Sequence, residues 1–365
     1  MSGTLRTNMA EKRVTETDSA LTYKVKRGGE ISDYVKLDKL PRLNLLTDQV
    51  NDLISKNSWY ELYGVDWLII VFGVLGAFMG LSLMSSDSYL NFVTGVLLYG
   101  YCHSVLSTKG GHSAAHSAVV NSVRWNKFWA IFFMEFIGSF SEELANEIHI
   151  KSHHPHTNII GHGDSSTWKA PFVPAYIYMF VAPLIVPVIT PLVAFAGLVG
   201  KWKHLLRFLL VAPAGLAINF LLLMNISKFS LWGAIVVTFV SRATMSIPYI
   251  HVNIFQHIGL AMYSPKSRPK KIYQMSTGVL NLSSNFLLNY CFGHGIISCH
   301  VEHHLFPRLS DNMCLKIKPL VSRFLKHNGL EYNESDYFRR MIYFVNEYDD
   351  LMVKAPPITH FVGIQ

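Results

Sequence analysis

The chain has 365 residues, of which 50% are hydrophobic and 13% aromatic, while only 15% carry a charge. This balance is more apolar than that of an ordinary soluble domain, and it favours an integral membrane protein. The formal net charge of +8 comes without a basic cluster interleaved with aromatics. It therefore argues for contact with anionic lipid headgroups or an acidic protein partner, and against nucleic-acid binding.

Polar segments flank the apolar part of the chain. Residues 1–60 are mixed in charge and contain no apolar stretch of the kind found in a cleaved signal peptide. We expect residues 1–60 to form a cytosolic N-terminal segment, residues 61–330 a membrane domain, and residues 331–365 a cytosolic C-terminal segment. The four cysteines form no C-x-x-C pair and are expected to be buried thiols.

Four apolar runs are predicted to cross the membrane. Residues 67–84 carry no charge and are long enough to span a bilayer, and residues 89–107 follow after a short polar turn. Residues 205–226 and 229–249 are predicted to cross as a hairpin. The shorter run 128–140 is expected to lie in the membrane interface.

A fifth apolar run, residues 172–199, is predicted to dip into the cytosolic leaflet without crossing. Pro183, Pro187 and Pro191 interrupt a continuous helix there, and lysines follow at 201 and 203, which the positive-inside rule places in the cytosol. Residues 305–352 mix apolar and charged positions at helical spacing. The expected fold is thus an all-α integral membrane protein with about four transmembrane helices and a cytosolic helical cap.

Nine histidines fall into four tight groups at helical spacing. The groups are His112 and His116; His149, His153 and His154; His257, four residues after Asn253; and His300, His303 and His304. Residues three or four positions apart lie on one helical face, so each group is predicted to aim two imidazoles at one point. The sequence therefore predicts a polynuclear metal centre at a bilayer surface, with all groups facing one compartment.

The number of ligands bears on the metal. A zinc site takes about four ligands, so nine imidazoles exceed what one ion needs and suit two ions with four or five each. Imidazole suits iron as well as zinc or copper, and the lack of clustered thiolates argues against copper(I) or an iron–sulfur cluster. Two irons with an open position are suited to binding and splitting dioxygen.

The arrangement H-x(3)-H, H-x(3)-H-H and H-x(2)-H-H around paired apolar spans resembles the membrane fatty acid desaturase family, over roughly residues 60–325. The resemblance implies that the nine histidines ligate two iron ions on the cytosolic face, most often of the endoplasmic reticulum. It implies that Asn253 contacts the metal through water. It also implies desaturation of a fatty acyl chain of a lipid substrate, with dioxygen as co-substrate.

Two features separate the chain from the front-end branch of that family. The third box begins with His300, where front-end members usually have glutamine, and no His-Pro-Gly-Gly haem motif is present. Both imply a separate electron donor, for which a cytochrome b5-type protein with its reductase is expected. The basic residues Lys266, Arg268, Lys270 and Lys271 are candidates for docking that carrier or an acyl headgroup, although a lipid-facing loop is the simpler interpretation.

Other polar residues near the boxes are candidates for supporting roles. Glu147, Asp164 and Glu302 are candidates for orienting imidazoles, and His156 and His162 for lying close behind the ligands. Three other functions stay open at this point: a related di-iron hydroxylase of acyl, sphingoid or sterol chains, a membrane zinc-dependent lipid hydrolase, and a non-catalytic metal-binding or lipid-binding membrane protein.

Overall fold

The computed structural model describes residues 25–27, 30–32, 40–160, 162, 172–263, 265 and 268–354. Over these residues the chain is mostly helical, with two small two-stranded sheets, so the all-α class is confirmed. The N-terminal elements are β1 (Val25–Arg27), β2 (Glu30–Ser32) and α1 (Leu43–Ser55). The two strands pair antiparallel, and α1 packs on α14 (Asp311–His327), so part of the polar N-terminal segment lies against the later half of the chain.

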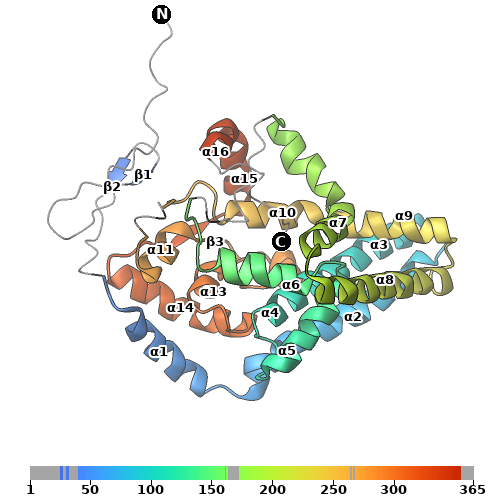
Figure 1. The fold of residues 1–365 in the computed structure, drawn as a ribbon, viewed down its shortest axis with the longest axis horizontal. Coiled ribbons are helices and arrows are strands. Elements are labelled where there is room, and N and C mark those ends of the chain that lie inside the picture. The colour runs from blue at the N-terminus through green and yellow to red at the C-terminus, as the bar shows by residue number, and fades with distance from the viewer. Residues whose placement is uncertain are drawn as a thin grey trace, which may run out of the picture.

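Four long apolar helices extend from one side of the molecule (Figure 1). They are α2 (Val65–Met84), α3 (Tyr89–Ser104), α8 (Trp202–Asn225) and α9 (Leu231–Thr244). Helix α2 contacts α3, α3 contacts α9, and α9 contacts α8. The π-helical turn η2 (Tyr60–Gly64) leads into α2. The predicted span 67–84 therefore lies inside one helix that ends at the expected residue.

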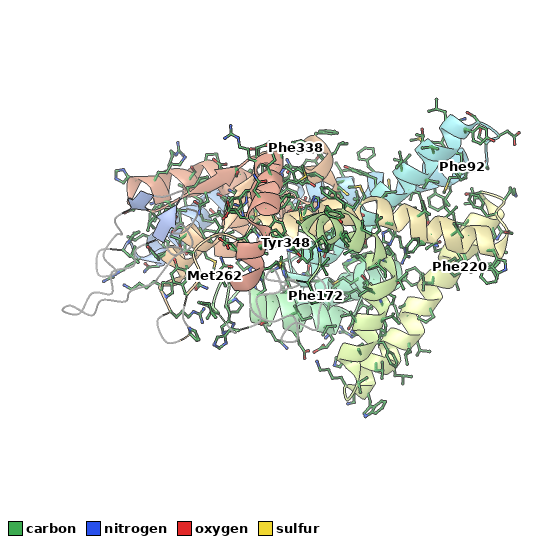
Figure 2. All side chains as sticks on the ribbon, turned by 90° about the horizontal axis from the view of Figure 1, so that it is seen from above. Phe92, Phe172, Phe220, Met262, Phe338 and Tyr348 are labelled. Carbon is green, nitrogen blue, oxygen red and sulfur yellow. The ribbon has the colours of Figure 1, made fainter. Side chains whose placement is uncertain are left out.

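The outer surface of these helices is apolar. Phe72 is 67% exposed on α2 and Leu210 is 65% exposed on α8, whereas monomeric soluble proteins seldom expose such a continuous face. Tyr89 and Trp232 are exposed at the starts of α3 and α9, and amphipathic rings of this kind gather at membrane–water boundaries. Figure 2 shows Phe92 and Phe220 on the part of the molecule that lies away from Met262.

By length and hydropathy, four helices among the described residues are able to cross a membrane. Three of them match spans expected from the sequence, and the fourth does not. Tyr60–Met84, Trp202–Asn225 and Leu231–Phe255 agree with the prediction. Ile177–Leu198 meets both criteria, and the helix that begins at Tyr89 does not. Helix α3 carries several polar residues, yet it packs extensively against α2.

Segment 177–198 is a bent helix. It consists of the π-helical η6 (Ile177–Val181), the 3₁₀ turn η7 (Ala182–Ile185) and α7 (Val186–Leu198). The expected interruption is present at Pro183, where the 3₁₀ turn forms, whereas Pro191 lies inside α7. That 177–198 enters the membrane without crossing it stays a prediction.

Short elements connect the membrane helices and carry the first two histidine boxes. They are η3 (Val105–Gly110), α4 (Gly111–Ala115), α5 (Val123–Ala130), η4 (Ile131–Ile137), α6 (Glu142–Ala145) and η5 (Asn146–His153). The expected interfacial run 128–140 is mostly helical and packs on α8 through η4. Gly215 allows this approach, because a Cβ there would overlap the carbonyl oxygen of Phe136.

The later third of the chain folds over the boxes as a set of short helices. They are α10 (Ser246–Phe255), α11 (Lys271–Gly278), α12 (Phe286–Phe292), α13 (His300–Leu305), α14, α15 (Tyr337–Asn346) and α16 (Tyr348–Lys354). Strand β3 (Leu280–Leu282) pairs in parallel with β4 (Asn333–Ser335). The expected helical cap is therefore present, and Figure 1 shows α11, α13 and α14 on the side away from the free ends of α8 and α9.

Candidate metal centre

All nine histidines of the four boxes come together in two groups. One group holds five side chains, His112, His116, His149, His154 and His303. The other holds four, His153, His257, His300 and His304. Within each group the potential ligand atoms all lie within 4.8 Å of one another, although the residues are up to 191 positions apart along the chain.

The imidazoles point the same ring nitrogen, Nε2, at one another. In the five-histidine group, His154 Nε2 lies 3.1 Å from His116 Nε2 and 3.1 Å from His303 Nε2. In the four-histidine group, His257 Nε2 lies 2.8 Å from His300 Nε2. The two groups adjoin, because the ring of His154 stacks near that of His304 with centroids 4.4 Å apart.

The grouping agrees with the i and i+4 spacing in the first and third boxes but not in the second. His112 shares a group with His116, and His300 with His304, whereas His149 shares its group with His154 and not with His153. The cause is the π-helical segment η5, in which the His154 N–H donates to the His149 carbonyl five residues earlier. This wider turn places residues i and i+5 on one face and sends His153 to the other group.

Three histidines have the ring nitrogen that faces away from the groups held by the surrounding structure. The His300 Nδ1 lies 2.8 Å from the Gly295 carbonyl oxygen, and the His257 Nδ1 lies 3.3 Å from the Gly278 carbonyl oxygen. The His304 Nδ1 lies 3.1 Å from the Thr157 hydroxyl, which also donates to the His153 carbonyl. Such contacts fix the tautomer and the ring orientation of a ligand.

This arrangement fits a bound cation. A neutral imidazole has one donor nitrogen and one acceptor nitrogen. When the Nδ1 atoms of His257 and His300 donate to carbonyls, both Nε2 atoms present lone pairs, and they face each other at 2.8 Å. Two acceptors at that distance repel unless a shared cation contacts both, so the donor set favours metal binding.

Burial lowers the pKa of several of these imidazoles and so favours their neutral form. It lowers the pKa of His112 to about 4, a shift that nearby Lys109 supports and Asp311 opposes. Burial together with neighbouring imidazoles also holds the pKa values of His154 and His304 well below 6.5. Metal ligation requires the unprotonated ring, so the site is prepared for metal at neutral pH.

The expected supporting carboxylates have other partners. Glu147 pairs with Lys201, and Glu302 accepts hydrogen bonds from Asn281 and Tyr332, at 3.0 Å and 2.7 Å. Within the part of the chain that the structure describes, neither forms a hydrogen bond or ion pair with an imidazole, so these two interpretations were wrong. Glu302 instead helps to hold α13, because the Asn281 side chain also accepts from the Val301 N–H at 2.8 Å.

The remaining candidates from the sequence fall in different places. Asn253 lines the cavity beside the histidines, with its amide donating to the Tyr249 carbonyl at 2.7 Å. His156 and His162 stack on each other, outside both groups. Asp164 lies outside the described residues.

The basic loop before α11 is partly used inside the molecule. Arg268 donates to the Pro155 carbonyl and Lys271 to the Leu305 carbonyl, each just after a histidine box. These two cations therefore also hold the ends of boxes, while Lys266 lies outside the described residues. That this loop docks a carrier or an acyl headgroup stays a prediction.

Two supporting features were missed from the sequence. The Asn158 amide donates to the carbonyls of His257, Ala261 and Gly278, each at 3.1 Å, and so ties the second box to the His257 segment. The sequence offered only the Asn and Thr of the H-H-P-H-T-N run as a signal, because the partners of Asn158 lie 99 to 120 residues away along the chain. The other missed feature is a buried ion triad.

The ion triad joins a membrane helix to the cap. Lys109 is 1% exposed and contacts Asp66 of α2 and Asp311 at the start of α14. Asp311 also accepts from the Gly295 N–H at 2.8 Å, and the Gly295 carbonyl is the partner of His300. The backbone of Gly295 therefore links the triad to His300, which belongs to the four-histidine group.

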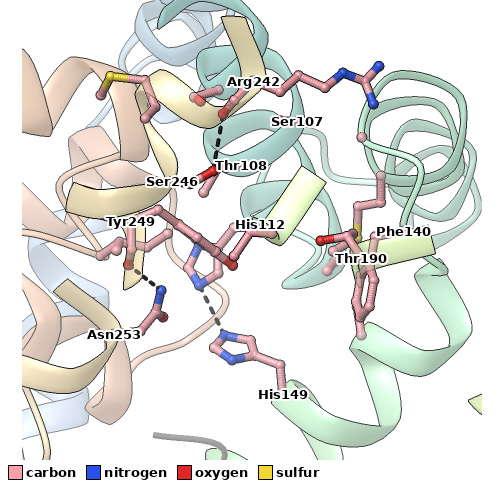
Figure 3. Close-up of a pocket in the computed structure, with 18 of the residues that line it drawn as sticks. Ser107, Thr108, His112, Phe140, His149, Thr190, Arg242, Ser246, Tyr249 and Asn253 are labelled. Carbon is pink, nitrogen blue, oxygen red and sulfur yellow. Dashed lines mark hydrogen bonds between the residues drawn. The ribbon is translucent and has the colours of Figure 1, made fainter. Parts of the chain in front are cut away.

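A cavity of about 150 Å³ lies against both groups. Five of the nine histidines line it, namely His112, His149, His153, His257 and His300. Its walls are otherwise mainly apolar and come from η4, η5, α7 and the segment before α13, with Met134, Ile148, Val186 and Ile296 among them. Figure 3 shows His112 and His149 facing each other at the edge of this cavity, with Asn253 beside them. Its lining suits an aliphatic chain next to the histidines.

Comparison with known proteins assigns the chain to a family. The family described as fatty acid desaturase matches residues 87–336. The chain is 47% identical to fatty acid desaturase 6 of Bos taurus over 325 residues, which is 88% of this chain and 95% of that protein. It is 46% identical to fatty acid desaturase 6 of Homo sapiens over 317 residues, covering 86% and 89% of the two chains. Similarity to fatty acid desaturase 3 of Bos taurus is lower, at 22% over 257 residues, 63% of this chain and 55% of that protein.

These similarities cover the segments that carry all four histidine boxes. They confirm the family resemblance seen in the boxes, including its likeness to the fatty acid desaturase 6 type. They also place the chain in a family of oxidoreductases. The protein belongs to the fatty acid desaturase family.

Proposed function

We propose that this protein introduces a double bond into a fatty acyl chain, with two iron ions held by the nine box histidines. The observation that carries the proposal is the division of the histidines into adjoining groups of five and four. One zinc ion takes about four ligands, whereas this division supplies a ligand set for each of two ions. His112, His116, His149, His154 and His303 would hold one iron, and His153, His257, His300 and His304 the other.

The irons, when bound, would supply the oxidising chemistry that removes two hydrogens from neighbouring methylenes while dioxygen is reduced to water. The protein's part is positioning. The carbonyls of Gly278 and Gly295 and the Thr157 hydroxyl hold the ligand rings in place. Rings fixed in this way keep their ligand atoms aimed at the centre without reorganisation.

The cavity performs the second task, which is to hold the acyl chain and exclude water. Met134, Ile148 and Ile296 offer an aliphatic chain an apolar surface beside the histidines. Holding one methylene pair next to the reactive centre raises the rate by fixing the geometry, and a dry wall suppresses side reactions. Asn253 lines the same cavity, and we propose that it holds a water molecule between its side chain and the centre.

Electrons must come from outside the chain, since the sequence contains no flavin or nicotinamide fingerprint. We propose a cytochrome b5-type carrier with its reductase. We also propose that the boxes face the cytosol in the endoplasmic reticulum membrane. Lys201 and Lys203, at the start of α8 and near the second box, support this orientation under the positive-inside rule.

The test is lipid profiling of cells that express the wild type, His303→Ala or His327→Ala, with iron measured in each purified protein. His327 is an exposed histidine at the end of α14, outside both groups, and serves as the matched control. We expect new unsaturated chains and iron with the wild type and the control. His303→Ala should lose the product and part of the iron.

Three results would contradict the proposal. Products that gain one oxygen atom would indicate a hydroxylase. About one zinc per chain, with lipid cleavage in the absence of dioxygen, would indicate a hydrolase. Iron binding without any product, in the presence of a reconstituted electron supply, would indicate a non-catalytic protein.

A further inference from the structure

A second cavity, of about 430 Å³, shares no lining residue with the cavity at the histidine groups. Its walls come from the first half of α2, the second half of α3, α12 and α14. The lining includes Leu68, Phe72 and Gly76 of α2, Leu98 of α3, Tyr290 of α12 and Leu315 of α14. We call this cavity the α2 groove. None of the nine box histidines lines it, so the proposed chemistry does not account for it.

The α2 groove opens on the face of α2 that would contact lipid. Leu68 is 43% exposed and Phe72 is 67% exposed, and both lie on a helix long and apolar enough to cross a membrane. The walls beside them, at Ile69 and Leu98, are apolar as well. A lipid from the surrounding leaflet is therefore the occupant that this position favours.

Polar groups gather at one end of the groove. The Asn312 backbone N–H donates to the Asp66 Oδ2 at 3.2 Å, so these two lining residues lie together where α2 begins. His294 adjoins them, because the next residue, Gly295, donates its N–H to Asp311, which precedes Asn312. Gly76 follows ten residues after Asp66, which is about 15 Å along a helix axis. The groove is thus polar at one end and mainly apolar over the rest, as a membrane lipid is.

Two side chains of the lining retain hydrogen-bonding capacity. The His294 Nδ1 lies 3.2 Å from the Ser298 hydroxyl. Within the part of the chain that the structure describes, the His294 Nε2 and the Tyr290 hydroxyl have no hydrogen-bond partner. Burial lowers the pKa of His294 and favours the neutral ring, whose Nε2 either donates or accepts according to the tautomer. A hydroxyl group on a ligand can complement both tautomers, because it donates and accepts.

The charges at the polar end disfavour an anionic headgroup. No lysine or arginine is among the described residues that line the groove. Asp66 is already paired with Lys109 at 2.8 Å, and Lys109 also contacts Asp311, so the triad has one negative charge in excess. A phosphate or a carboxylate brought to this end would be repelled and would find no cation. The polar end therefore suits an uncharged headgroup.

We propose that the α2 groove binds a membrane lipid with an uncharged hydroxyl head, and that a sterol is the lipid whose size fits it. The hydroxyl lies at His294 and Tyr290, and the ring system lies along α2 between Leu68 and Gly76. Pockets of about 300–1,000 Å³ hold ligands of the size of a sterol. The two acyl chains of a diacylglycerol exceed the groove, so most of that lipid would stay outside it.

The experiment uses a photoreactive cholestanol that has a diazirine on its ring system and a free hydroxyl. Purified metal-loaded protein in phosphatidylcholine nanodiscs is illuminated with this probe, and the labelled peptides are identified by mass spectrometry. We expect labelling of α2 and α12. Cholesterol should compete about threefold to tenfold better than cholestene, which lacks the hydroxyl, because one hydrogen bond is lost.

Two pairs of variants separate the head from the groove. His294→Leu should remove the preference for cholesterol over cholestene and His294→Gln should keep part of it, while His327→Leu, at an exposed histidine, should leave it intact. Leu68→Trp fills the groove and should abolish the labelling, whereas Leu210→Trp places the same ring on the exposed face of α8 and should not.

Labelling that survives in Leu68→Trp, or equal competition by cholesterol and cholestene in the wild type, would overturn the proposal. Stronger competition by dioleoylglycerol than by cholesterol would overturn the sterol as the ligand. Stronger competition by phosphatidic acid would overturn the uncharged head. If His294→Leu fails to fold, Leu68→Trp and the comparison of cholesterol with cholestene on the wild type still decide the question.

Discussion

Replacement of Lys109 by methionine tests how the ion triad supports both the fold and the centre. Lys109 is 1% exposed, and its ammonium lies between Asp66, at 2.8 Å, and Asp311. Methionine keeps the volume but leaves two buried carboxylates facing each other without a cation. Breaking a buried pair in this way costs about 3–5 kcal/mol. In a chain of this size that corresponds to a fall of roughly 6–10 °C in apparent melting temperature.

The same change should reach the metal centre. Asp311 holds the Gly295 N–H, and the Gly295 carbonyl holds His300, so a displaced Asp311 disturbs one ligand of the four-histidine group. We expect Lys109→Met to lower the iron content as well as the melting temperature in detergent. The combined variant Lys109→Met, Asp66→Asn, Asp311→Asn leaves no uncompensated charge and should recover most of the stability. If the single variant melts like the wild type, or the combined variant melts no higher than the single one, the reasoning is refuted.

Three further outcomes follow from packing and ligand orientation. Gly215→Ala should destabilise the protein by at least about 2 kcal/mol in thermal melts, because its Cβ overlaps the Phe136 carbonyl oxygen in a close crossing of α8 and η4. Thr157→Val removes the hydroxyl partner of the His304 Nδ1 and should weaken iron binding about tenfold to hundredfold, as measured by competition with a chelator. Removal of the metal by a chelator should lower the apparent melting temperature, with recovery on adding ferrous iron, because ions bound only by the folded state stabilise it.

Each of these outcomes has a control in the same chain. Gly278→Ala places a Cβ no closer than 3.5 Å to other atoms and should leave the melting temperature nearly unchanged, which separates steric overlap from the loss of a glycine. Thr157→Ser keeps the hydroxyl and should retain iron. If chelation removes the iron but leaves the melting temperature unchanged, metal bound at the histidines does not stabilise the folded protein.

The sequence predicted the membrane helix α2 and the nine clustered histidines because both signals are local. An uncharged apolar run at 67–84 leaves little choice but a long helix, and the structure places α2 at Val65–Met84. Clustered imidazoles at helical spacing are rare without a shared ligand, so the convergence of His112 with His303 could be inferred although they lie 191 residues apart.

The sequence could not predict which histidines share a group. The inference assumed α-helical spacing, whereas η5 is a π-helix, and the wider turn places His153 in the group of His304 and not in that of His149. The ion triad was hidden for a different reason. Lys109 lies 43 residues from Asp66 and 202 from Asp311, so each charge taken alone resembled an ordinary residue at the end of a helix.

The shared groups also constrain how the chain crosses the membrane. His153 precedes segment 177–198 and the helices α8 and α9, while His257 follows them, yet the two belong to one group. The chain must therefore return to the side from which it left, which requires an even number of crossings between them. Helices α8 and α9 are long and apolar enough to supply two, and a third full crossing by 177–198 would then separate histidines whose potential ligand atoms lie within 4.8 Å of each other. The bend at the 3₁₀ turn agrees with a segment that does not cross the membrane, although the hydropathy of the segment alone would allow a crossing.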